Sequence, residues 1–218
     1  MADSIKILYK EGNGEITEKK SRFIATLRPV SDLDSAMSFI EEIRKKNWDA
    51  RHNCYAFTIG DNHEITRCSD DGEPSGTAGR PMLEVLMGEG VHNAAVVVTR
   101  YFGGVLLGTG GLVRAYQAAV KEGLDHCSVI EKTAGDIWEI SCNYSSIGKL
   151  QYIMASEGVI PLATDYASDI IVKAALSCGS CDNIIKEITE GLNGNVSFKK
   201  GEAVSYAVLD GKTIILKQ

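Results

Sequence analysis

Apolar residues recur along the chain with two periods, and the changes between them predict where strands and helices lie. Alternating or continuous apolar runs indicate strands, whereas spacings of three and four residues indicate helices. In the first part of the chain, this pattern predicts two strands within 6–29 joined by a turn at Gly12-Asn13-Gly14, a helix over 31–47, a strand over 53–59 that returns over 64–67, a short helix over 82–87, a buried strand over 91–99, a helix over 110–123 and a strand over 127–130.

The remaining residues follow a different order. The pattern predicts a strand over 137–144, a helix over 145–156, a hairpin of strands over 159–167 and 170–177, a helix over 182–192 and a strand from 196 onward. This β-α-β-β-α-β order is typical of a ferredoxin-like domain. Residues 133–136 read as a linker, so we predict two domains, 1–134 and 135–218, and an α+β fold class.

Charge and composition support this division. All eight arginines and all four histidines lie within residues 1–126. The net charge of −6 argues against a protein that coats nucleic acid non-specifically. No apolar run approaches the roughly 20 residues that span a bilayer, and the N-terminus lacks the apolar segment of a secretory signal. We therefore expect a cytoplasmic protein with free thiols and no membrane partner.

A polar stretch, Ser69–Arg80, is the first candidate site. Asp70, Asp71 and Glu73 place three carboxylates within four positions, which suits a hard cation or a division of acid and base roles. The alternating ligands of a calcium loop are absent. The alternative is a turn-rich surface loop, and we predict neither a metal nor a cofactor.

A glycine-rich stretch, 96–116, is the second candidate. It reads as a buried strand, a turn with five glycines and the start of a helix. It matches neither of the standard nucleotide-binding patterns. Amides at a helix N-terminus together with nearby guanidiniums suit a phosphate or carboxylate, and an exposed aromatic ring suits a base. We predict one composite ligand- or RNA-binding site formed by the 69–80 loop and the 100–114 turn, in which Tyr101 or Phe102 stacks on a base. Its residues are Asp70, Asp71, Glu73, Arg80, Arg100, Tyr101, Gly108, Gly110, Gly111 and Arg114. The compatible alternative is that the glycines allow close packing and the arginines pair with the carboxylates of 70–73.

Two cysteine arrangements are secondary candidates. His52 and Cys54 share one face of a strand, as a nucleophilic pair requires, but Cys54 lies in an apolar strand where inert buried thiols are common. Cys178 and Cys181 form a Cys-x-x-Cys pair directly before a helix, which suits redox chemistry. Two small residues in a turn are the favoured interpretation of that second pair.

Three motifs together resemble the IMPACT family, specifically its bacterial YigZ-like branch. They are the run from Ser69 to Pro81, the run from Val98 to Gly104, and Leu107-Gly108, with His52 and Cys54 preceding them. The resemblance implies an α/β sandwich similar to the second domain of a small-subunit ribosomal protein, followed by a ferredoxin-like domain similar to the fifth domain of elongation factor G. Eukaryotic members of the family regulate translation under amino-acid starvation and compete for a ribosome-associated activator of a stress kinase. The Cys-x-x-Cys pair is not part of the family pattern.

The leading hypothesis is a translation-associated binding or regulatory protein that contacts RNA, the ribosome or a ribosome-associated factor. A pure protein-interaction module is a further possibility. The alternative from another class is a small hydrolase or kinase-like enzyme that acts on a phosphorylated substrate through Asp70, Asp71, Glu73 and the glycine-rich turn. Whether there is any catalysis stays open, and a binding protein is preferred.

Overall fold

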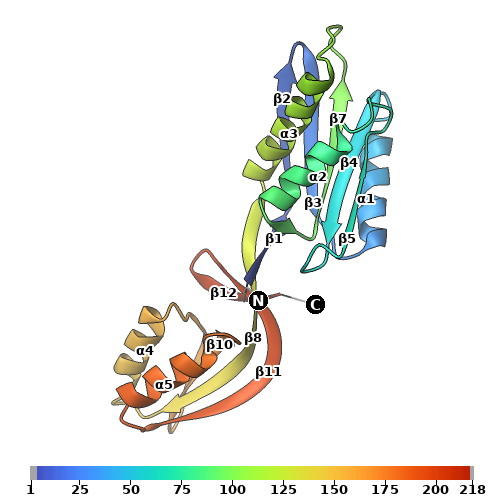
Figure 1. The fold of residues 1–218 in the computed structure, drawn as a ribbon. Coiled ribbons are helices and arrows are strands. Elements are labelled where there is room, and N and C mark those ends of the chain that lie inside the picture. The colour runs from blue at the N-terminus through green and yellow to red at the C-terminus, as the bar shows by residue number, and fades with distance from the viewer. Residues whose placement is uncertain (1–3, 217–218) are drawn as a thin grey trace. The chain divides into compact units, whose positions relative to one another are not determined.

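The computed structural model describes residues 4–216, which form two compact units (Figure 1). The first unit contains Ile5–Ile130, and the second contains Ser4 and the described residues from Glu131 onward. No helix in the described part of the chain is long and apolar enough to cross a membrane.

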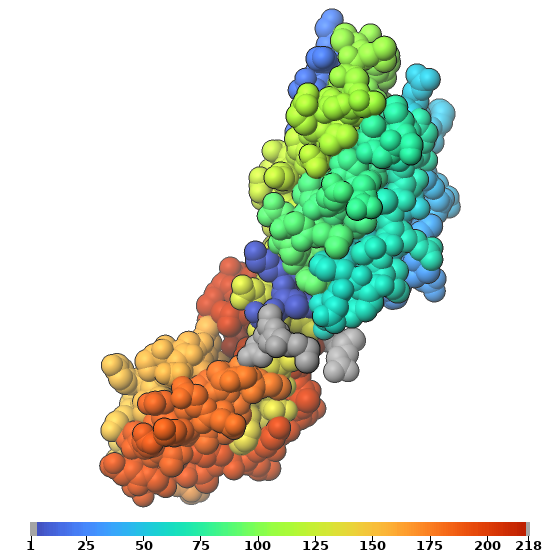
Figure 2. Space-filling model, viewed as in Figure 1, coloured from blue at the N-terminus to red at the C-terminus, as the bar shows by residue number. Residues whose placement is uncertain are grey.

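The first unit is built on a five-stranded antiparallel sheet with helices on both faces. The strand order is β2 (Gly12–Glu18), β3 (Ser21–Pro29), β7 (Ala94–Tyr101), β4 (His52–Ile59) and β5 (Ile65–Ser69). One face is covered by α1 (Leu33–Lys46), and the other by α2 (Gly79–Gly88) and α3 (Thr109–Asp125) (Figure 1). Figure 2 shows the face that α2 and α3 cover. A short strand, β6 (Val91–His92), pairs in parallel with β1 (Ser4–Lys10).

Alternation along the central strands separates two apolar cores. Val96 and Val98 of β7 pack toward α2 and α3, whereas Ala95 and Val97 pack toward α1. Both faces of β7 are covered, which explains its continuous apolar sequence. The predicted alternation in β4 is confirmed, since Cys54 and Ala56 lie in the first core while Tyr55, Phe57 and Ile59 lie in the second.

The first hairpin differs from its prediction. Gly12-Asn13-Gly14 lies inside β2, and the turn to β3 is at Lys19 and Lys20, which both have positive φ. A Cβ at Gly14 would lie 2.5 Å from the backbone nitrogen of Gly123 in α3. These glycines therefore serve close packing of the helix on the strand, and the apparent turn signal was misleading.

Two further boundaries differ. The predicted strand over 91–99 is interrupted at Asn93, whose φ is +54°, so that β6 leaves the main sheet. The helix α2 begins at Gly79 rather than at 82. The predicted helix over 31–47 is confirmed as α1, and the side chain of Asp32 caps it by accepting from the Ser35 backbone N–H at 2.7 Å.

The second unit has the predicted ferredoxin-like topology. The elements are β8 (Ser128–Cys142), α4 (Ile147–Ser156), β9 (Pro161–Tyr166), β10 (Ile170–Ser177), α5 (Cys181–Gly191) and β11 (Val196–Leu209), followed by β12 (Lys212–Leu216). The first four strands form an antiparallel sheet in the order β9-β10-β8-β11, which packs against both helices, and β12 pairs with β11 as a hairpin. The predicted linker over 133–136 is wrong, because these residues are in β8 and pair with β11 from Thr133↔Tyr206 to Asp136↔Ala203.

Candidate functional site

The loop after β5 turns sharply and sends one carboxylate inward. Asp71 and Gly72 have φ values of +44° and +84°, and the Glu73 backbone N–H donates to the Asp70 carbonyl at 2.9 Å. Two consecutive positive φ values suit an Asp-Gly pair in a tight turn. The turn leaves Asp70 and Asp71 half-buried and buries the side chain of Glu73.

Asp70 holds the start of α2. Its carboxylate accepts from the backbone N–H groups of Gly76 at 2.8 Å, Ala78 at 3.0 Å and Gly79 at 2.8 Å. Burial works to raise the pKa of Asp70, but these three donors outweigh it and the pKa is lowered. The carboxylate thus takes the place of a capping side chain, which explains why α2 begins earlier than predicted.

Asp71 ties the loop to α1 and β4. Its carboxylate receives Arg44 Nη2 at 3.0 Å and the Asn53 backbone N–H at 2.7 Å. Its carbonyl oxygen accepts from His52 Nδ1 at 2.9 Å, so that ring nitrogen carries the proton. Both oxygens of Asp71 are therefore engaged in positioning the loop.

Glu73 forms a buried ion pair with Arg100. Its Oε1 lies 2.5 Å from Arg100 Nη1 and accepts from the Tyr116 hydroxyl at 2.9 Å. The two charged side chains are 3% and 7% exposed. The guanidinium lies 5.3 Å from the ring centre of Phe23 and 5.6 Å from that of Phe102. Here the loop after β5, the end of β7 and α3 meet.

The Cys54 thiol belongs to the same cluster. Its sulfur lies 2.9 Å from the Asp70 carbonyl oxygen and 3.3 Å from the Tyr116 hydroxyl. Burial, with a contribution from the Glu73 carboxylate, raises the pKa of Cys54 to about 12. This supports the inert interpretation of the His52 and Cys54 pair, because a nucleophilic thiol needs a lowered pKa.

The other predicted ligand-binding residues lie elsewhere on the first unit. Tyr101 points to the opposite face of β7 from Arg100, where its hydroxyl donates to Asp49 at 3.1 Å. Arg80 is exposed and pairs with Glu84 at 2.9 Å. The start of α3 is exposed at Gly108 and Gly110, and Gly111 packs on Leu107.

Arg114 lies one turn into α3 and extends over Gly110. A Cβ at Gly110 would be 3.6 Å from Arg114 Nη1. With Glu84 and Gln117, Arg114 lines a hollow of about 480 Å³ between α2 and α3. Arg100 and Arg114 therefore occupy different environments, one a buried ion pair and the other an open groove.

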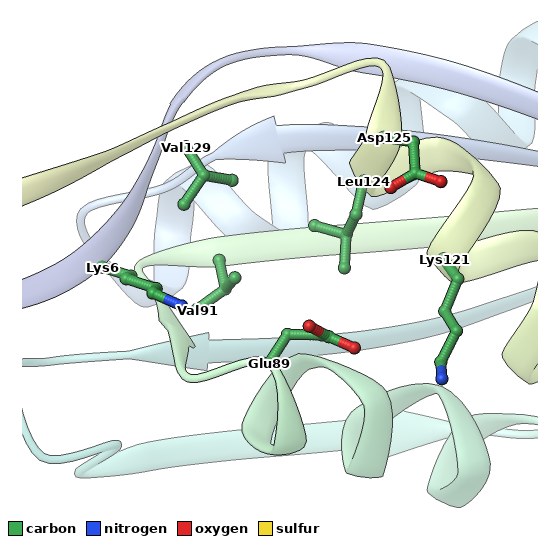
Figure 3. Close-up of a pocket in the computed structure, with 7 residues that line it drawn as sticks. All are labelled: Lys6, Glu89, Val91, Lys121, Leu124, Asp125 and Val129. Carbon is green, nitrogen blue, oxygen red and sulfur yellow. The ribbon is translucent and has the colours of Figure 1, made fainter. Parts of the chain in front are cut away.

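A second hollow adjoins this groove and shares Glu89 and Lys121 with it (Figure 3). It measures about 450 Å³ and is also lined by Lys6, Val91, Leu124, Asp125 and Val129. Charges of both signs alternate around it, which selects no single class of ligand. Among the described residues, no group of three or more His, Cys, Asp or Glu side chains has the arrangement of a metal site.

Sequence reasoning considered Phe102 as an exposed ring but missed the apolar surface to which Val105 and Leu106 contribute. The turn from β7 to α3 exposes Phe102, Val105 and Leu106, the last to 82%. We call these three residues the apolar tip. The Gly103 N–H donates to Ser21 Oγ at 3.2 Å, and a Cβ at Gly103 would lie 2.0 Å from the backbone of Lys20. The glycines that flank these side chains were the available signal, because they leave apolar residues no helix or strand face to pack on.

Tyr116 was also missed as a polar residue. The sequence places it on the apolar stripe of α3, and it is fully buried there. A buried tyrosine hydroxyl requires a partner, and Glu73 supplies it. That requirement was the signal that a polar group would lie beneath the helix.

Comparison with known proteins gives consistent matches over both units. Residues 19–124 match the family model described as "Impact N-terminal domain", and residues 140–195 match "Domain of unknown function (DUF1949)". The chain is 40% identical over 202 residues to "IMPACT family member YvyE" of Bacillus subtilis, covering 93% of each chain. It is 36% identical over 181 residues to "IMPACT family member YigZ" of Escherichia coli, covering 82% of this chain and 88% of that one.

More distant and structural matches agree. "Protein IMPACT" of Xenopus laevis is 32% identical over 126 residues, covering 55% of this chain and 40% of that one. A solved structure, "Crystal structure of an hypothetical protein", is similar with a TM-score of 0.59 and 33% identity, covering 93% of this chain and 99% of that one.

Proposed function

The chain belongs to the IMPACT family, and from that premise we propose that it is a cytoplasmic binding protein of the translation machinery that contacts a ribosome-associated protein. The family resemblance implies translation control. The observation that supports contact with a protein partner is the apolar tip, Phe102, Val105 and Leu106.

The apolar tip has the character of a protein-binding surface. Apolar side chains that cluster at the surface mark interaction sites more often than isolated ones do. The tip is held by Arg100, which stacks beneath Phe102, and by the bond from Gly103 to Ser21. Arg100 is itself fixed by Glu73. A preorganised apolar loop loses little conformational entropy when a partner binds it.

The same cluster argues against RNA as the direct partner at this position. Contact with phosphate needs an exposed cation. Arg100, predicted for that role, is buried against Glu73. Val105 and Leu106 are aliphatic, so Phe102 supplies the one ring of the tip on which a base can stack. In the second unit, Glu139 lies 3.1 Å from both Lys173 and Lys199, so these cations of the sheet are already paired.

The enzyme alternative gains no support from the carboxylates. Asp70 caps α2, Asp71 binds Arg44 and Asn53, and Glu73 binds Arg100 and Tyr116. A general base or a magnesium ligand would need an oxygen directed at substrate. The arrangement instead fits a structural role for the acidic loop.

Co-sedimentation with ribosomes tests the proposal. Full-length protein is mixed with crude bacterial ribosomes or with ribosomes stripped of associated proteins by a high-salt wash. We expect wild type to pellet with crude ribosomes and to lose most of that binding on washed ones. Leu106→Asp should abolish binding, because it places a charge at the centre of the apolar tip.

A matched control comes from Trp48, which is 83% exposed outside the tip. Trp48→Asp makes the same kind of change at equal exposure and should leave binding intact. Equal pelleting of wild type and Leu106→Asp would refute a role for the tip. Full binding to washed ribosomes would contradict a ribosome-associated partner, and binding to purified ribosomal RNA would assign the contact to RNA instead.

A further inference from the structure

A pair of cysteines in the second unit has no place in the proposed function. Cys178 follows β10, and Cys181 is the first residue of α5. Cys178 is exposed, whereas Cys181 is buried at the edge of the apolar core beneath α5. The Cys178 thiol is therefore accessible to solvent, whereas the Cys181 thiol is shielded from it.

The backbone between the two cysteines is a turn with fixed ends. The Cys178 N–H donates to the Ala134 carbonyl of β8 at 3.2 Å. Ser180 N donates to Ser177 Oγ at 3.1 Å, and the first helical bond runs from Ile184 N to the Ser180 carbonyl at 3.0 Å. A turn brings Cα atoms three residues apart to within about 7 Å, and disulfides span about 4.4 to 6.8 Å. The turn thus suits a bond between the two sulfurs.

A charged pair from the sheet lies beside both thiols. Asp136 of β8 and Lys200 of β11 are 2.8 Å apart and lie on the sheet face that α4 and α5 cover. The Asp136 carboxyl and the two cysteines raise the pKa of Lys200, the Asp136 bond most of all. Burial raises the pKa of Cys181, the carboxylates of Asp182 and Asp136 add to that rise, and the Lys200 ammonium opposes it. The Lys200 ammonium thus favours the thiolate of Cys181, the reactive form, against burial and the two carboxylates.

We propose that Cys178 and Cys181 are a redox-active dithiol that closes to a reversible disulfide by exchange with a small-molecule or protein disulfide. Lys200 is a positioning residue that supports the thiolate form. No residue of the apolar tip takes part, so this proposal stands independently of the binding function.

The exchange balances without any further reactant. The Cys178 thiolate attacks one sulfur of a disulfide RSSR, forms a Cys178–S–S–R bond and releases RS⁻. The Cys181 thiolate then attacks the Cys178 sulfur, forms the intramolecular bond and releases the second RS⁻. The two RS⁻ groups take up the two protons that the cysteines lost. The pair is oxidised by two electrons, and RSSR is reduced to two RSH.

Peptide mapping of the unmodified full-length chain tests this directly. The protein is equilibrated with glutathione buffers of graded ratio, quenched in acid, alkylated and digested with trypsin. Cleavage after Lys173 and Lys186 releases residues 174–186, which contain both cysteines and no other. We expect this peptide to lose both alkyl groups together and to become lighter by two hydrogens in oxidising buffer, with full reversal by reductant. Retention of both alkyl groups at every ratio would overturn the proposal.

Variants separate the two steps. In Cys181→Ser, Cys178 should stop at a mixed disulfide with glutathione, whereas wild type passes through it. Wild type that also stops at the mixed disulfide would overturn ring closure. Cys68, an exposed cysteine of the first unit, serves as the internal control for simple glutathione addition.

The role of Lys200 is tested by the pH profile of the oxidation rate. Lys200→Gln should slow closure severalfold at neutral pH, and the difference should vanish at high pH where thiols ionise unaided. Lys199→Gln is the matched control, because Lys199 lies next to it on β11 but pairs with Glu139 on the other face of the sheet. Equal profiles for the two variants would remove Lys200 from the site.

Discussion

The buried ion pair between Glu73 and Arg100 gives the sharpest test of how the acidic loop is held. We consider Glu73→Gln, Arg100→Met and the double variant in the full-length chain. Each single change removes one charge and leaves the other buried. Loss of one partner from a buried ion pair costs about 3–5 kcal/mol of unfolding free energy.

The structure places this pair at the upper part of that range. The side chains of Glu73 and Arg100 are 3% and 7% exposed, so water does not reach an orphaned charge. Arg100 Nε is already buried without a hydrogen-bond partner. The Glu73 carboxylate is the counter-charge of the guanidinium, so its loss leaves the charge of Arg100 unpaired. Glu73→Gln also weakens the acceptor of the Tyr116 hydroxyl. In the double variant both charges are gone, so its cost should be below the sum of the single costs by roughly 0.5–3 kcal/mol.

Urea unfolding by circular dichroism measures these costs, and hydrogen exchange in peptides from β7 assigns them to the first unit. Glu15→Gln is the control, because it breaks an exposed ion pair in which Glu15 Oε1 lies 2.8 Å from Arg22 Nε. Exposed pairs contribute little to stability. Single variants no less stable than Glu15→Gln, or costs that simply add, would refute the claim that the buried pair organises the loop.

Four further predictions concern Asp70, Cys54 and two glycines. Asp70→Asn should destabilise the protein by about 1–3 kcal/mol at neutral pH. The pKa of Asp70 is lowered in the folded protein. Its contribution to the free energy of unfolding is therefore present above the ordinary pKa of about 3.9 and is lost as the pH falls through the lowered value. The unfolding free energies of wild type and variant, measured in urea, should thus converge in acid. In the native protein, Cys54 should resist alkylation by iodoacetamide at pH 8, because it is buried and its pKa is raised, while exposed Cys68 reacts. Mass spectrometry of the quenched protein measures both alkylation rates, and equal rates for the two cysteines would contradict this expectation. Gly14→Ala should cost about 1–3 kcal/mol because its Cβ meets α3. Gly148→Ala, with open space in α4, should stabilise by about 0.5–1 kcal/mol, and equal shifts in melting temperature would refute both expectations.

The fold was predictable wherever periodicity and capping agreed. The helix α1 combined an apolar stripe with Asp32 as its cap, and the second unit followed its β-α-β-β-α-β order. Errors arose where a tertiary contact overrode a local signal. Asn13-Gly14 has the composition of a turn but lies under α3, and residues 133–136 read as a linker although β11 pairs with them.

The site was less predictable because strand alternation and burial decide it. Neighbouring residues Arg100 and Tyr101 were expected to act together, yet they point to opposite faces of β7. The pairing of Arg100 with Glu73 followed the packing interpretation that the sequence left open. The exposure of Leu106 depends on where the turn from β7 to α3 lies in space, which no local pattern encodes.

Site-specific photo-crosslinking in living cells tests the central claim most directly. A photoreactive amino acid replaces Leu106 in one variant and Trp48 in a second, two positions of equal exposure. We predict that position 106 crosslinks to one ribosome-associated protein and that position 48 does not. Crosslinks to RNA at position 106, or the same products at both positions, would contradict the proposal that the apolar tip binds a protein partner.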